Sequence, residues 1–452
     1  MTSNPQKFRV FFGDPDLPQM FMMFLPIFVD RILNSLIGTV HSYFVADAGE
    51  AAISAISLAN QVNSMLASVF FSVCSAIIIV VAQTVGSGDR EKASLTIGHA
   101  LTFVFYGTSA IGLIFVLFPA WIMKLFFGDI DPEILDQSIK YIRLLGVSLP
   151  FEGIFQSCAC ASRGFNEHKM PMFVSVSGSV IKLIFSFFLI KIFHLGIIGA
   201  AIAVLAGRVY NAFIGYYILH RRKWIASLRK CIVVNFRILK NVIYLGVFSS
   251  TEHFTTMFAG TIKTGYLVPY GVSHITASSV FGTFNELFNT IPFCMTTLVR
   301  NYVAIGIGSK NIARAHHMIW KCYIYNVTLS IIMWVSAFFA LPHIFPLYTQ
   351  NEETLGLLAV ILLLNTFGQP ILSIFAGTIR AALDGAGDAK FATVVTMICL
   401  LVFDLGLGYI LTVNMGLGII GATISGLCSM FVKSIVYFIR YKSGRWKNHV
   451  MV

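Results

Sequence analysis

Charged residues are scarce in this chain. They make up 12% of its 452 residues, whereas 57% of the residues are hydrophobic. Soluble domains carry roughly 25% charged residues. The composition therefore excludes an ordinary soluble domain and predicts a membrane protein.

The sequence also lacks the motifs of several protein classes. It has no G-x-x-x-x-G-K-[ST] phosphate loop, so nothing in it predicts ATP hydrolysis, and it shows no nucleophile–base constellation. Its eight cysteines include no Cys-x-x-Cys pair, which argues against a metal site or a disulfide framework. The first residues show no apolar core followed by a cleavage site, so we predict no signal peptide. We expect no enzyme activity, no cofactor and no bound metal.

Long apolar runs occupy most of the chain. A helix needs about 20 apolar residues to cross a bilayer, and helices satisfy their own backbone groups where no water is present. About twelve such runs follow one another: roughly 20–45, 53–84, 97–125, 136–158, 171–193, 197–219, 241–267, 275–302, 317–344, 354–379, 391–412 and 417–440. The sequence predicts an all-α polytopic membrane protein.

An internal repeat divides the runs into two sets of six. The hexapeptide Leu-Gly-Ile-Ile-Gly-Ala occurs at Leu195–Ala200 and again at Leu417–Ala422. The same offset in residue number relates Asn63 to Asn285 and Gly86 to Gly308. We predict two pseudo-symmetric six-helix lobes, the N-lobe (1–219) and the C-lobe (241–452), joined by a linker (220–240). Duplicated halves around a central cavity are typical of secondary transporters.

The net charge of +12 comes from basic residues that gather in alternate loops. Examples are Lys92, Lys169, the run 220–240, Lys310 and Lys447, whereas the intervening loops carry Asp131, Glu352 and Glu353. This is the positive-inside asymmetry of membrane proteins and does not indicate nucleic-acid binding. It predicts a multi-pass membrane protein with both termini in the cytoplasm and an even number of spans. We expect the protein to lie in the plasma membrane.

Ionisable residues inside the apolar runs are candidates for ion coupling, because a charge in the membrane is costly and usually functional. They are Asp30, His41, Glu252 and Glu286. The repeat offset places Asp30 opposite Glu252 and His41 opposite Lys263. The alternatives are a hydrated position near the helix start or a gate contact between the lobes.

Further polar residues in the runs are candidates for lining a substrate cavity. They are Lys263, Asn63, Asn285, Lys182, Asp404 and Arg300. Lys182 and Asp404 are again related by the repeat offset, so a salt bridge between the lobes is one hypothesis.

Several segments together resemble the multidrug and toxic compound extrusion (MATE) family of cation-coupled antiporters. The run Val81–Asp89 resembles the family's loop after its second helix, Arg163–Pro171 the loop after its fourth, and Asp384–Asp388 the later copy. The resemblance covers nearly the whole chain. It implies two six-helix lobes, a central cavity, alternating access by rocking, and export of small organic compounds driven by a proton or sodium gradient.

The chain departs from the family at the usual cation ligands. Acids of the family's first, seventh and tenth helices align with His41, Thr256 and Ser373, and polar residues of its fifth helix align with Lys182 and Ser186. The coupling ion, H⁺ or Na⁺, therefore stays open, and so does an anionic or zwitterionic substrate. Two other functions remain, a related lipid-linked saccharide or lipid flippase and a transport-inactive sensor. We expect a monomer whose partners are its substrate and membrane lipid.

Overall fold

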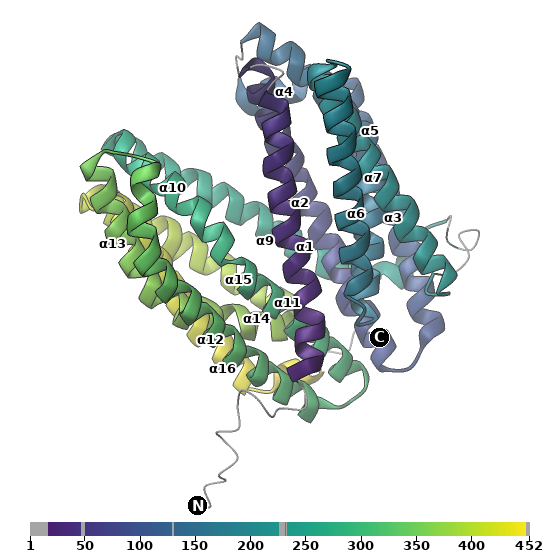
Figure 1. Cartoon of the computed structure of the whole chain (residues 1–452). Coiled ribbons are helices and arrows are strands. Elements are labelled where there is room, and N and C mark those ends of the chain that lie inside the picture. The colour runs from purple at the N-terminus through teal and green to yellow at the C-terminus, as the bar shows by residue number, and fades with distance from the viewer. Residues whose placement is uncertain (1–16, 47–49, 129–130, 226–230, 232, 449–452) are drawn as a thin grey trace, which may run out of the picture.

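A computed structural model describes residues 17–46, 50–128, 131–225, 231 and 233–448 (Figure 1). The described part is helical and contains no strand. In the N-lobe the elements are α1 (Leu17–Ala46), α2 (Glu50–Gly86), α3 (Arg90–Leu117), α4 (Pro119–Phe127), α5 (Pro132–Gly164), α6 (Lys169–Ser186), η2 (Phe187–Ile192) and α7 (Gly196–Arg221).

The C-lobe repeats this order. Its elements are α9 (Phe236–Leu267), η3 (Val268–Tyr270), α10 (Val272–Phe288), α11 (Thr290–Gly308), α12 (Ile312–Ile344), η4 (Phe345–Leu347), α13 (Glu352–Gly368), η5 (Gln369–Ser373), α14 (Ile374–Ala386), α15 (Ala389–Cys399), η6 (Leu400–Leu407), η7 (Ile410–Asn414), α16 (Gly418–Lys442) and η8 (Arg445–Asn448). Every apolar run predicted from the sequence falls on helical structure, although the run 97–125 covers both α3 and α4 and the run 275–302 covers both α10 and α11. The all-α membrane fold with twelve spans in two lobes is confirmed. By length and hydropathy alone, ten helices of the described part qualify as membrane spans.

Equivalent helices begin in the same way in the two lobes. The Asp89 side chain accepts a hydrogen bond from the backbone N–H of Lys92 at the start of α3. At the equivalent position of the repeat, Asn311 accepts one from Arg314 at the start of α12. Such caps satisfy N–H groups that have no partner inside the helix. The repeat therefore extends to local structure.

The duplicated hexapeptide has the same structural role in both lobes. Each copy follows a π-helical stretch, η2 or η7, and opens a helix, α7 or α16. Gly196 and Gly418 both have positive φ, 51° and 53°. A glycine adopts this backbone conformation without steric cost, which explains its place at each chain reversal.

The first helix of each lobe begins in the hydrophobic core of the other lobe. Met20 and Phe24 near the start of α1 pack in a C-lobe cluster with Tyr441. Conversely, Leu239 and Leu245 near the start of α9 pack in an N-lobe cluster. The beginnings of α1 and α9 therefore tie each lobe to the other at the end of the molecule where α16 finishes.

Polar and close backbone contacts also join the lobes at this end, where the two groups of helices meet in Figure 1 before diverging. Gln83 Nε2 donates to the carbonyl oxygen of Gly385 over 3.2 Å, and Asn301 Nδ2 donates to Asn166 Oδ1 over 2.9 Å. A Cβ on Gly308 would lie 2.0 Å from the carbonyl oxygen of Gln83. Only glycine permits this approach of α11 to α2.

Candidate functional site

The N-lobe contains a polar cavity of about 390 Å³ between α1, α5, α6 and α7. Its charged lining residues are Asp30, Arg31, Glu152, Lys182 and Arg208. Three of these five are basic. Two of the sequence-predicted residues, Asp30 and Lys182, therefore line one cavity, although they were assigned to ion coupling and to substrate binding.

Asp30 belongs to a hydrogen-bonded chain across this cavity. Asn34, one turn later in α1, donates from Nδ2 to Asp30 Oδ1 over 2.7 Å and to Ser175 Oγ over 3.0 Å. Ser179 donates to Asn34 Oδ1 over 2.6 Å. The carboxyl group of Asp30 is therefore held between α1 and α6, and a change in its charge would act on the contact between these two helices.

Glu152 is occupied by neighbours from its own lobe. Arg208 Nε lies 3.4 Å from Glu152 Oε2, and Gln156 Nε2 donates to Oε1 over 2.8 Å. Arg208 also donates to Ser148 Oγ over 2.7 Å. The acid and the arginine of this wall thus largely satisfy each other.

Lys182, in contrast, has no hydrogen bond or ion pair within the described ranges. Gly207 lies opposite, where a Cβ would be 3.2 Å from Lys182 Cβ. Asn211 also lines the cavity, and its Oδ1 is buried without a partner among the described residues. A cation and an amide are therefore left unmatched on one side of the cavity. Buried polar groups are normally paired, so their position suits a ligand.

His41 lies eleven residues after Asp30 in α1, about 16 Å along the helix axis. Its side chain is buried, and Nδ1 is 2.8 Å from Ser186 Oγ in α6. Ser186 is one helical turn beyond Lys182. His41 therefore joins α1 to α6 at a second level, beside the Lys182 end of the cavity.

The C-lobe contains a matching cavity of about 390 Å³, whose walls include Lys263, Asp404 and Asn365. Asp404 Oδ1 accepts from Lys263 Nζ over 3.3 Å. Its Oδ2 accepts from Ser429 over 2.6 Å and lies 3.6 Å from Lys433 Nζ. This acid is therefore surrounded by two cations and a hydroxyl group.

The hypothesis of a bridge between Lys182 and Asp404 is wrong. Asp404 bonds residues of its own lobe, whereas Lys182 lines the N-lobe cavity. The repeat places the two residues at equivalent positions of separate lobes, and equivalent positions need not face each other. The sequence analysis missed Lys433. The signal that could have found it is a lysine inside an apolar run, one turn beyond Ser429.

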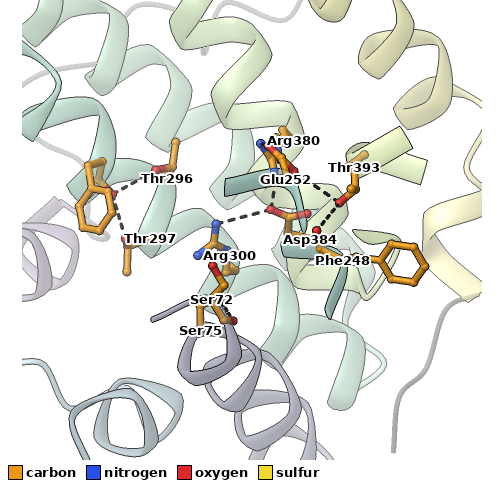
Figure 2. A network of polar contacts seen from close by, with 12 residues as sticks. Ser72, Ser75, Phe248, Glu252, Thr296, Thr297, Arg300, Arg380, Asp384 and Thr393 are labelled. Atoms are coloured by element: carbon orange, nitrogen blue, oxygen red, sulfur yellow. Dashed lines mark hydrogen bonds and ion pairs between the residues drawn. The ribbon is translucent and has the colours of Figure 1, made fainter. Parts of the chain in front are cut away.

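Glu252 is part of a charge network inside the C-lobe (Figure 2). Arg380 donates to both carboxylate oxygens of Glu252, and Thr393 donates to Oε2 over 3.4 Å. Asp384 lies 3.6 Å from Arg380 Nε and 3.5 Å from Arg300 Nη2. Arg300 thus belongs to this network and to neither of the two cavities. Sequence reasoning missed Arg380, although Arg380 and Asp384 have the spacing of an ion pair on one helix face.

The remaining candidates lie on α2 and α10. Glu286 is exposed, and it attracts Arg31 electrostatically across the lobes. The Arg31 guanidinium also lies over the Phe293 ring, 3.6 Å from its centroid. Asn63 and Asn285 each have a buried Oδ1 without a partner in the described part of the chain. Glu286 and the two asparagines line neither cavity.

Comparison with known proteins decides the family. The model of the MatE family matches the sequence twice, over residues 26–188 and 249–410, one match in each lobe. The chain belongs to the MatE family. The chain is 22% identical over 445 residues to the probable multidrug resistance protein YoeA of Bacillus subtilis (strain 168), covering 95% of this chain and 94% of that protein.

Solved structures show the same MatE fold. The Vibrio cholerae MATE transporter VcmN in its bent form superposes with a TM-score of 0.87 at 17% identity, covering 95% of this chain and 97% of that one. A transporter of the MOP superfamily from Pyrococcus furiosus superposes with a TM-score of 0.82 at 20% identity, covering 96% and 97%. That protein is described as having a binding pocket of reverse polarity, which suggests a different function.

Proposed function

We propose that this protein is a secondary active antiporter that exports small organic compounds by alternating access. The charged cavity inside the N-lobe is the observation that carries the proposal, because a cavity with unmatched polar groups in a two-lobed membrane protein needs a ligand. Membership in the MatE family supports it, as does the similarity to the probable multidrug resistance protein YoeA.

The orientation follows from charge. Basic residues such as Lys92, Lys240 and Arg440 lie at the end where the lobes join, and the positive-inside rule assigns this end to the cytoplasm. Both termini would then be cytoplasmic, and the protein would lie in the plasma membrane. The described arrangement would be closed toward the cytoplasm by contacts such as Asn166–Asn301.

Asp30 is the ion-coupling candidate best supported by its surroundings. It lines the cavity and is bonded through a neutral amide, so one proton or cation would change its charge and its bond to Asn34. Both oxygens of Glu252 are instead engaged by Arg380, which leaves this acid less open to a coupling ion. Glu286 and His41 are secondary candidates.

The substrate would be anionic or zwitterionic. At the position where the C-lobe places Asp404 between cations, the N-lobe places the ammonium group of Lys182 without an acid bonded to it. A carboxylate or phosphate of the substrate would supply this missing charge. The reversed pocket polarity described for the Pyrococcus relative is consistent with this view.

Proteoliposomes test the function. The purified protein is reconstituted, a proton or a sodium gradient is imposed separately, and the movement of an anionic and a cationic fluorescent compound is recorded. We expect gradient-driven movement of the anionic compound. Movement of neither compound under either gradient would refute the antiporter, and movement of only the cationic compound would refute the proposed substrate charge.

A further inference from the structure

Another cavity, separate from the two described above, lies where α9 and α15 begin and α16 ends. Its volume is about 550 Å³, and it is lined by Lys240 and Tyr244 of α9, Lys390, Phe391 and Val394 of α15, and Arg440 of α16. None of these residues lines the two polar cavities or belongs to the charge network around Glu252. The cavity therefore needs its own explanation.

The rim of this cavity is strongly basic. Lys240 and Lys390 are exposed, and neither has an ion-pair or hydrogen-bond partner in the part of the chain that the structure describes. Arg440 donates from Nε to Asp388 Oδ2 over 2.7 Å and from Nη2 to Oδ1 over 3.2 Å. Asp388, the single acid of the lining, is thus paired with Arg440 and leaves the two lysines uncompensated.

Helix geometry adds to the positive charge. Asp388 is the N-cap residue of α15, but its side chain makes no capping bond to the helix. The first backbone N–H groups of α15, next to Lys390, therefore lack a side-chain cap, and the helix dipole places partial positive charge at this end. The dipole, two free lysines and Arg440 converge on one cavity.

The wall below the rim is apolar and open to the surroundings of the protein. Tyr244 is 38% exposed and Val394 is 42% exposed. The exposed surface continues at Val247 on α9 and at Ile398 on α15, each about one turn further from the charged end. Thr393 Oγ1, 3.5 Å from the carbonyl oxygen of Phe248, shows that α9 and α15 run against each other here. The exposed apolar residues of α9 and those of α15 therefore form two rows. Between these rows lies an apolar seam that extends from the basic rim over about 10 Å.

We propose that this cavity binds the headgroup of an anionic phospholipid, with one acyl chain along the seam between α9 and α15. A soluble anion would need only the basic rim, whereas the exposed apolar seam below it matches an amphiphile with a charged head. Basic pockets between membrane helices hold anionic lipid headgroups by this combination of charge and position. The chain of contacts through Thr393 would connect the bound lipid to Glu252 of the charge network.

The test measures lipid binding to the purified full-length protein in a nonionic detergent. Dioleoyl phosphatidylglycerol and dioleoyl phosphatidylcholine are titrated separately, and bound lipid is counted by native mass spectrometry. We expect K240Q/K390Q to bind phosphatidylglycerol at least about tenfold more weakly, because the variant loses two cations that attract the anionic headgroup. We expect phosphatidylcholine to bind more weakly than phosphatidylglycerol, and to bind equally to the wild type and to K240Q/K390Q.

Two further arms make the result specific. Lys92 lines a neighbouring cavity that also contains Asp89 and Glu91, so K92Q removes a lysine from the same end and should leave phosphatidylglycerol binding unchanged. V394N should weaken phosphatidylglycerol binding without altering the rim. Elution volume and thermal unfolding show whether each variant is folded.

Equal phosphatidylglycerol binding by the wild type and K240Q/K390Q would overturn the proposal. So would displacement of the lipid by millimolar inorganic phosphate, because the site would then serve a soluble anion. A loss of binding in K92Q as large as in the double variant would show that only the total charge matters and would also overturn it.

Discussion

Lys263 Nζ lies 3.3 Å from Asp404 Oδ1 in the C-lobe, and the two equivalent positions of the N-lobe hold His41 and Lys182. The same pair of helices therefore carries an ion pair in one lobe and two basic side chains in the other. Duplication preserved the backbone while the charges diverged. Lys263 is therefore bonded to an acid of its own lobe, whereas Lys182 has no acid bonded to it among the described residues.

Removing Asp404 should destabilise the protein more than removing Lys263. D404N leaves Lys263 and Lys433 as neighbouring cations without an acid, whereas K263M leaves the contacts of Asp404 with Lys433 and Ser429. Loss of one member of a buried pair costs about 3–5 kcal/mol, and partial exposure here lowers our expectation for D404N to about 2 kcal/mol. Thermal unfolding in detergent measures both variants. An equal or larger loss in K263M would contradict the prediction.

Replacement of Lys182 should weaken substrate binding without unfolding the protein. Lys182 has no bonded partner among the described residues, so K182Q breaks no internal ion pair. A charge-assisted hydrogen bond contributes about 1.5–3 kcal/mol, and we expect KM for an anionic substrate to rise about tenfold or more. K182R should retain most of the activity. Transport kinetics in proteoliposomes give both values, and an unchanged KM in K182Q would exclude Lys182 from the substrate site.

The helices and their order were predictable from the sequence. The length of an apolar run and the charge of a loop can be read without knowing which helices pack against each other. The run 53–84, for example, corresponds to α2 (Glu50–Gly86), and the duplicated hexapeptide opens both α7 and α16. A bilayer requires about 20 apolar residues wherever they occur. Lobe architecture therefore follows from counting residues and comparing the halves.

The partners of the charged residues were not predictable. Glu252 bonds Arg380 from a helix much later in the chain, and Asp404 bonds Lys263 rather than its repeat equivalent Lys182. A pairing depends on which helix faces meet, and the sequence gives the spacing within a helix but not the rotation of one helix against another. Glu152 was missed for the same reason, because it stands alone in an apolar run until Arg208 is brought beside it.

Asp30 should be required for coupling to the ion gradient. D30N keeps the shape of the side chain but removes the titratable carboxylate that Asn34 bonds. We expect gradient-driven transport to fall by at least about tenfold because the titratable group is lost. An anionic substrate should still bind, because D30N removes a negative charge from the wall of the same cavity. E352Q is the control, because Glu352 is an exposed acid that lines neither cavity, and E286Q tests the secondary candidate. If E286Q loses coupling and D30N retains it, the assignment passes to Glu286.

Gly308 should be required for closure of the lobes. A side chain there would meet the carbonyl oxygen of Gln83 at 2.0 Å, so G308V forces α11 away from α2. Because this contact lies where the lobes join, we expect transport to fall by about tenfold or more and the protein to lose about 1–3 kcal/mol of stability. G356A is the control, since no atom lies within 4 Å of a Cβ at Gly356. Wild-type transport by G308V would show that the close approach is not needed.

His168 should make stability depend on pH. It lies between α5 and α6, outside both membrane spans, and it is buried with neither ring nitrogen bonded in the described structure. Burial, with Arg163 adding to the effect, lowers the pKa of His168 to about 3. The unfolded chain binds this proton near pH 6.5, so stability that is present above this pH is lost as the pH falls toward 3.

The expected loss from His168 is about 2 kcal/mol between pH 7 and pH 5, because each pH unit below 6.5 contributes about 1.4 kcal/mol. H168N cannot be protonated and should show a smaller fall in unfolding temperature over this range. H343N replaces an exposed histidine and should follow the wild-type curve. Parallel curves for H168N and the wild type would mean that His168 accepts its proton in the folded protein, which would place it in contact with water or an acid.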